Sequence, residues 1–117
     1  MSADLMLFED AELIHPNYAP RASIDERWQQ FRDLNGWLVP YLGRLADEWI
    51  AATGNRRTGM KALFERVRWN GAVATRGDRF KVNNDFRAPA TRDLIALRPD
   101  LADVFAVRER KSLVRAA

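Results

Sequence analysis

The stretch RRTGMKALFERVRWNGAVATRGDRFKVNNDFR, Arg56 to Arg87, decides the fold, because a helical pattern gives way to a different one within it. Apolar side chains recur at helical spacing in its first half, at Met60, Leu63, Phe64 and Val67. This spacing predicts a helix with one buried stripe, running from a Thr58 cap to about Trp69. We expect Asn70-Gly71 to weaken or end that helix.

The second half of the stretch alternates apolar and polar residues, as a half-buried β-strand does. Val73 and Thr75 stand before a Gly77-Asp78 turn, and Phe80 and Val82 follow it. We therefore expect a short β-hairpin, with the Arg-Gly-Asp triplet as its turn. A helix that frays through residues 72–75 fits the pattern nearly as well.

Two further helices are predicted before this stretch. The first opens at Ser23, whose hydroxyl can cap the helix while Glu26 reaches back, and it ends at Asn35-Gly36. The second begins near Trp37 or Pro40 and stops at Gly54. Their apolar stripes are Ile24, Trp28, Phe31 and Leu34 in the first helix, and Leu38, Leu42, Leu45 and Trp49 in the second.

The C-terminal third predicts two more helices. Residues 83–85 offer candidate caps for a helix that carries Leu94, Ile95 and Leu97. Pro89 either lies in the first turn after an Asp85 cap or begins the helix itself. Pro99 and Asp100 then open a last helix, whose acidic start and basic end suit the helix dipole.

The totals allow one domain. A chain of 117 residues with 47% hydrophobic content can bury a core, but it is short for two domains. We expect an acidic N-terminal arm over residues 1–22 and a single helical domain over residues 23–117. The expected fold is mainly α, a compact bundle of about five helices with a short β-hairpin, similar to a winged helix-turn-helix.

Several classes of function have no support in the sequence. The chain has no Cys and one His, His15, which stands before a proline in the arm and is a poor general base. No glycine-rich phosphate loop or calcium-binding loop occurs. We therefore expect a non-enzymatic protein without cofactor or metal. Since no apolar run is long enough for a signal peptide or a membrane span, we expect it in the cytoplasm, without a membrane partner.

The distribution of charge points to a polyanionic partner. The net charge of +3 combines −5 over residues 1–50 with +8 over residues 51–117. A phosphate backbone rewards such basic surfaces, because each neutralised phosphate releases condensed counterions. The candidate nucleic-acid-binding residues are Arg56, Arg57, Lys61, Arg68, Arg76, Arg79, Lys81, Arg87 and Arg92. Against this stands the general observation that charged residues mostly cover solvated surfaces.

Trp69 is the most informative single residue. It falls opposite the buried stripe of its helix, so it cannot share that burial. We expect it to pack under the following hairpin or against the last helix, since large aromatic side chains are mostly buried. Otherwise it is an exposed aromatic beside Arg68, suited to stacking on a base or anchoring a protein partner.

Two sequence motifs resemble a group of small phage and prophage proteins. GMKALFERVRW at 59–69 and FKVNNDF at 80–86, followed by RPDLADVFAVRERK, are similar to the group's patterns G-[IM]-[KR]-A-L-[FW]-E-x-x-R-W and F-K-[LV]-N-N. The resemblance covers about residues 23–111. The group has no known activity, so the resemblance implies an origin and an all-helical build. Pro89 departs from the continuous helix of the group.

The expected function is binding of nucleic acid, DNA rather than RNA, as a phage regulator or an accessory of DNA metabolism. The contact would involve the third helix, the hairpin and the start of the fourth helix. The alternative is a protein-interaction module or inhibitor, which docks on a host or phage protein through the basic face or through the acidic N-terminal half.

Overall fold

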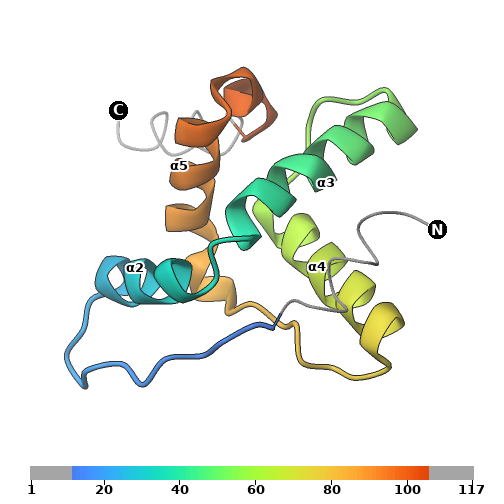
Figure 1. Cartoon of the computed structure of the whole chain (residues 1–117). Coiled ribbons are helices and arrows are strands. Elements are labelled where there is room, and N and C mark those ends of the chain that lie inside the picture. The colour runs from blue at the N-terminus through green and yellow to red at the C-terminus, as the bar shows by residue number, and fades with distance from the viewer. Residues whose placement is uncertain (1–11, 106–117) are drawn as a thin grey trace, which may run out of the picture.

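The computed structural model describes residues 12–105, and this part of the chain is mainly helical (Figure 1). Its α-helices are α2 (Ile24–Leu34), α3 (Leu38–Thr53), α4 (Met60–Thr75) and α5 (Arg87–Leu97). Two 3₁₀ helices flank α5, η1 (Asn84–Phe86) and η2 (Pro99–Leu101), and residues 102–105 are helical as well. The predicted compact, mainly α fold is confirmed for the described residues.

The sequence signals at the ends of α2 and α3 are confirmed. The amide of Glu26 donates to Oγ of Ser23 (3.1 Å), and the amide of Ser23 donates to Oε1 of Glu26 (3.0 Å), which completes the predicted capping box. α3 stops at Gly54, which takes the left-handed conformation (φ 71°) and donates its amide to the carbonyl of Ile50.

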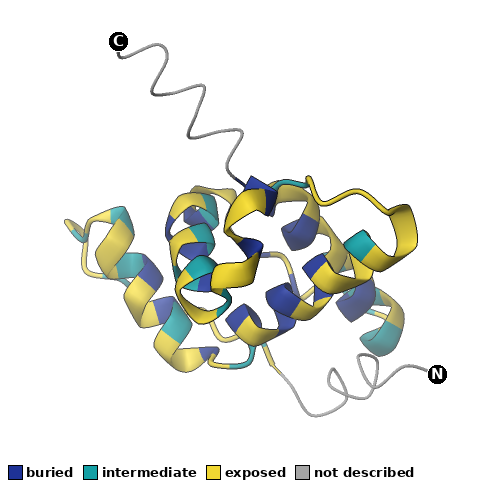
Figure 2. Cartoon of the chain, turned by 90° about the horizontal axis from the view of Figure 1, so that it is seen from above, coloured by how far each residue is buried: buried dark blue, intermediate teal, exposed yellow. Residues whose placement is uncertain are grey.

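The core receives side chains from all four of these α-helices, whose buried residues face inward (Figure 2). The ring of Phe86 lies 5.2 Å from that of Phe31 and 5.5 Å from that of Trp28, between centroids. At the edge of this cluster, Oδ2 of Asp93 accepts from the Trp28 indole (2.7 Å) and from Arg32 (2.9 Å). These contacts fix α2 against α5.

The predicted apolar stripes reach the core except at their last turns. Leu34 at the end of α2 and Trp49 near the end of α3 are exposed, as is Leu97 at the end of α5. The helical spacing of the stripes was predicted correctly, but the burial of Leu34 and Trp49 as members of those stripes was not.

Asn35 does more than end α2. Its buried side chain donates from Nδ2 to the carbonyls of Ile14 (2.8 Å) and Phe31 (2.8 Å), and its Oδ1 accepts from the amide of Ile14 (2.7 Å). Nearby, the Trp37 indole donates to the carbonyl of Glu12 (3.1 Å). Because a buried amide is stable only when hydrogen-bonded, these contacts hold residues 12–14 against the helical body.

α4 is longer than predicted, because Asn70-Gly71 lies inside it. Phe80 packs so closely over Gly71 that a Cβ there would lie 2.4 Å from its Cδ2. Nδ2 of the buried Asn70 donates to the hydroxyl of Tyr41 (2.7 Å). Asn70 and Gly71 therefore pack against other parts of the core and do not end α4. The predicted cap is also wrong: Gly59 is the N-cap, and no side chain, including that of Thr58, caps α4.

The predicted β-hairpin, and with it the winged-helix similarity, is wrong for the described residues, which contain no β-strand. Val73 and Thr75 belong to α4, which ends at Arg76 in a left-handed conformation (φ 55°). Phe80 and Val82 do alternate with exposed cations, and both are buried. The residues expected to form the first strand belong to α4, so no strand is present to pair with residues 80–82. Phe80 and Val82 therefore pack into the helical core instead of a sheet.

The last described elements follow one of the predicted alternatives. α5 begins at Arg87, so Pro89 lies in its first turn, but the capping side chain is Asn83, whose Oδ1 accepts from the amide of Asp85 (2.9 Å) at η1. Pro99 opens η2 rather than an α-helix. The predicted last helix continues as α-helix over residues 102–105, and the part of the prediction beyond residue 105 lies outside the described residues.

Gly71→Ala tests the packing of Phe80 on α4. At an open position inside a helix, alanine is favoured over glycine by about 0.5–1 kcal/mol. Here three ring and Cβ atoms of Phe80 lie within 2.7 Å of the added methyl group. We expect urea denaturation to show a loss of about 1–3 kcal/mol in the free energy of unfolding.

The control is Gly36→Ala, whose methyl group meets no heavy atom within 4 Å. It should change the free energy of unfolding by less than about 0.5 kcal/mol. A Gly71→Ala protein as stable as the wild type would show that Phe80 does not pack there.

Candidate nucleic-acid interface

Three of the nine predicted binding residues are paired with carboxylates. The pairs are Arg56–Asp103 (2.8 Å), Arg68–Asp78 (2.7 Å) and Arg92–Asp25 (2.7 Å). Each aspartate offsets the charge that a phosphate would otherwise meet. These three arginines are therefore weaker candidates for a polyanion contact than the sequence suggested.

The Arg68–Asp78 pair closes the turn after α4. Nε and Nη2 of Arg68 donate to the two carboxylate oxygens of Asp78 (2.8 and 2.7 Å), the bidentate geometry that suits a guanidinium. These hydrogen bonds lower the pKa of Asp78, and the nearby charge of Lys81 acts in the same direction. The Arg-Gly-Asp triplet is not the predicted hairpin turn: it forms the bend that follows α4, and its aspartate is paired with Arg68.

Within residues 12–105, the other six predicted cations take part in no ion pair: Arg57, Lys61, Arg76, Arg79, Lys81 and Arg87. They lie in two groups, one near the start of α4 and one at its end. A 16-residue helix is about 24 Å long, so roughly 20 Å separates the groups.

Trp69 lies on the outer side of α4 and is 65% exposed. The expectation that it packs under the next segment or against the last helix is therefore wrong. Gly71 follows two residues later and so faces nearly the opposite direction, where Phe80 covers it. Val73, one turn beyond Trp69, is 54% exposed, and Arg76 falls on almost the same side of the helix.

The indole group of Trp69 also differs from the other three in the chain. Trp28 donates to Asp93 (2.7 Å), while Trp37 and Trp49 donate to backbone carbonyls (both 3.1 Å). In the described part of the chain, the Trp69 indole has no acceptor. Tryptophan usually satisfies this N–H when buried, so an exposed, unbonded indole is available to a ligand.

Arg66 is a residue of this surface that the sequence prediction omitted. It was left out because it points away from the flank that holds Lys61 and Arg68. Its exposed side chain borders a hollow of about 540 Å³ beside Glu48 and Trp49 of α3. It also precedes Trp69 by three residues, which places the two side chains together on the helix surface. That spacing was visible in the sequence.

Arg76 is held in a costly backbone conformation. Among the described residues it is the one non-glycine residue with positive φ (55°). A left-handed conformation costs an L-residue about 1–2 kcal/mol, and glycine is usual at this position after a helix. The arginine keeps a cation at the negative end of the α4 dipole, about two turns after the exposed Trp69.

Residues 12–105 show neither a cluster of metal-binding side chains nor a membrane-spanning helix. They contain no group of three or more His, Cys, Asp or Glu side chains arranged to hold a metal ion. Nor does any helix in this range have the length and apolar character needed to cross a membrane.

Comparisons of the chain with protein-family models, with curated proteins and with solved structures found no match.

The arginine–aspartate pairs predict a loss of stability in acid. The pKa values of Asp78, Asp100 and Asp103 lie below the usual 3.8, because each carboxylate accepts hydrogen bonds from an arginine. A lowered folded-state pKa contributes stability above the unfolded value, and this contribution is lost as the pH falls through the folded value. Asp78→Asn should therefore lower Tm at pH 7 but not at about pH 2.

The matched control is Asp85→Asn, which removes an aspartate that has no ion pair within the described residues. Its Tm should follow that of the wild type across the same pH range. If the Tm difference caused by Asp78→Asn persists at about pH 2, the ion pair is not its source.

Proposed function

We propose that the chain is a small non-enzymatic DNA-binding protein, a regulator or DNA-metabolism accessory of a phage or prophage. Its contact surface is the α4 face, defined as Arg66, Trp69 and Val73 of α4, the C-cap Arg76, and Arg79 and Lys81 of the following loop. The observation that carries the proposal is Trp69, exposed and without an internal acceptor, among cations that have no ion pair in the described part of the chain.

The α4 face combines the two contacts that nucleic acids reward. Its arginines can bind phosphate oxygens, and the released counterions favour binding at low salt. The ring of Trp69 offers a surface on which a base can stack, a contact worth about 1–3 kcal/mol per base. The exposed tryptophan distinguishes this face from an ordinary solvated helix surface, on which charged and polar side chains suffice.

The second group of cations extends the same contact. Arg57, Lys61 and Arg87 lie near the start of α4, roughly 20 Å from the α4 face. Successive phosphates of one strand are about 3.4 Å apart along the axis, so about six nucleotides span this distance. A single bound DNA segment can therefore reach both groups, although they do not form one compact patch.

A protein partner is the second candidate. Trp69 and Val73 form an exposed apolar pair bordered by Arg66 and Arg76, and tryptophan and arginine are the residue types enriched at interface hot spots. An interaction module or inhibitor that docks through this pair would need the apolar contact more than the cations.

A gel-shift assay with the double variant Arg79→Ala/Lys81→Ala tests the DNA proposal. We expect the wild type to retard short DNA at low salt, with an affinity that falls steeply as salt rises. Removing two phosphate contacts should weaken binding to every sequence. It should also make the slope of log K against log [salt] less negative by about 1.4–1.8.

Arg21→Ala/Arg44→Ala is the matched control, because it removes the same charge from the segment before α2 and from α3. Its affinity should stay close to that of the wild type. Equal losses in both double variants would mean that only net charge matters. Absence of retardation of both duplex and single-stranded DNA by the wild type at low salt would reject the proposal in favour of a protein partner.

A further inference from the structure

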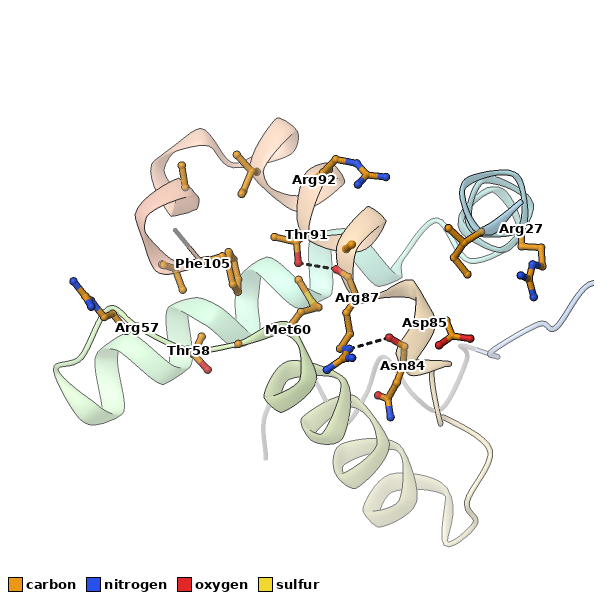
Figure 3. Close-up of a pocket in the computed structure, with 16 residues that line it drawn as sticks. Arg27, Arg57, Thr58, Met60, Asn84, Asp85, Arg87, Thr91, Arg92 and Phe105 are labelled. Carbon is orange, nitrogen blue, oxygen red and sulfur yellow. Dashed lines mark hydrogen bonds between the residues drawn. The ribbon is translucent and has the colours of Figure 1, made fainter. Parts of the chain in front are cut away.

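A cavity of about 960 Å³ lies at the other end of α4 from the exposed tryptophan (Figure 3). Its walls come from the start of α4, from η1 and α5, from α2 and from residues 102–105. Small-molecule sites usually enclose about 300–1,000 Å³, so this cavity is at the upper end of the range for a ligand site. The proposed DNA contact includes Arg57 and Arg87 at the rim of this cavity, but it does not account for the apolar interior.

The walls of the cavity combine an apolar interior with a cationic rim. Met60, Ile95 and Phe105 contribute apolar surface from three different elements. Among the described residues that line it, four are arginines and one is acidic, Asp85, and one of the four arginines is the paired Arg92. The remaining three have no ion pair within residues 12–105: Arg27, Arg57 and Arg87.

Arg87 is the cation nearest the middle of this site. Figure 3 shows its side chain between Met60 and Asn84, with Nε directed at the Asn84 carbonyl (2.9 Å). This hydrogen bond holds the guanidinium in place and leaves its two Nη groups without an acceptor among the described residues. Two amino groups fixed in this way form the fork that binds two oxygens of one phosphate.

The start of α4 adds unsatisfied backbone donors to the same walls. The helix starts without a capping side chain and without an acid in its first turn. The amides of Met60 and Lys61 therefore have no acceptor in the described chain, and such amides favour phosphate.

We propose that this cavity binds a phosphate monoester with an apolar or aromatic body, of the size of a nucleoside monophosphate. The phosphate group lies against Arg87 and the start of α4, and the body covers Met60, Ile95 and Phe105. Inorganic phosphate alone would leave this apolar wall in water, and an uncharged nucleoside would leave the arginines unmatched. The cavity is thus a small-molecule site separate from the α4 face.

Calorimetric titration of the full chain with AMP, adenosine and inorganic phosphate tests the proposal. We expect AMP to bind in one-to-one stoichiometry, and adenosine and inorganic phosphate each to bind at least tenfold more weakly. Arg87→Gln should weaken AMP binding at least tenfold. Because this variant also loses the bond to Asn84, Ala88→Trp provides a second test, since it fills the cavity mouth from an exposed position and keeps every charge.

Arg79→Ala/Lys81→Ala is the control, and it should bind AMP within twofold of the wild type while its DNA affinity falls. This outcome would separate the two sites. Absence of AMP binding at millimolar concentration would overturn the inference and leave the DNA proposal untouched. AMP binding that survives both Arg87→Gln and Ala88→Trp would overturn it as well, because the ligand would then bind elsewhere.

Discussion

The packing of Phe80 on Gly71 is the contact on which the rest of the structure depends. Phe80 is 2% exposed, and its ring also meets that of Trp37, with centroids 6.1 Å apart. Because Gly71 has no side chain, α4 continues through this point and the loop after it lies directly on the helix. The chain thereby carries Val82 and Phe86 into the core before α5 begins.

The same contact also leaves the opposite side of α4 exposed at the surface. With the following loop on the Gly71 side, no described segment covers Trp69, and the cations around it remain at the surface. Other arginines have a different role: Arg98 joins Asp47 of α3 to Asp100 of η2 (both 2.9 Å), and Arg56 binds Asp103. The basic half of the chain is thus divided between charges that fasten elements together and charges that remain for a ligand.

Local signals in the sequence predicted local structure well. The Ser23 capping box, the left-handed Gly54 and the buried stripe of α4 all depend on residues within a few positions of one another. The role of Asn70-Gly71 was mistaken, because whether a glycine ends a helix or admits a ring depends on a residue nine positions away. Pairs such as Arg56–Asp103, 47 residues apart, are equally hidden, since a count of charges does not say which carboxylate each arginine meets.

The most direct measurement is the response of the four tryptophan indole N–H signals in a ¹H–¹⁵N NMR spectrum to a short DNA oligonucleotide at low salt. Trp28, Trp37 and Trp49 donate within the protein, whereas Trp69 has no acceptor in the described chain. If the outward face of α4 is the contact surface, the Trp69 signal shifts first and most, and added salt reverses the shift. If DNA binds and the Trp69 signal does not move, or if only the other indole signals shift, the account is contradicted.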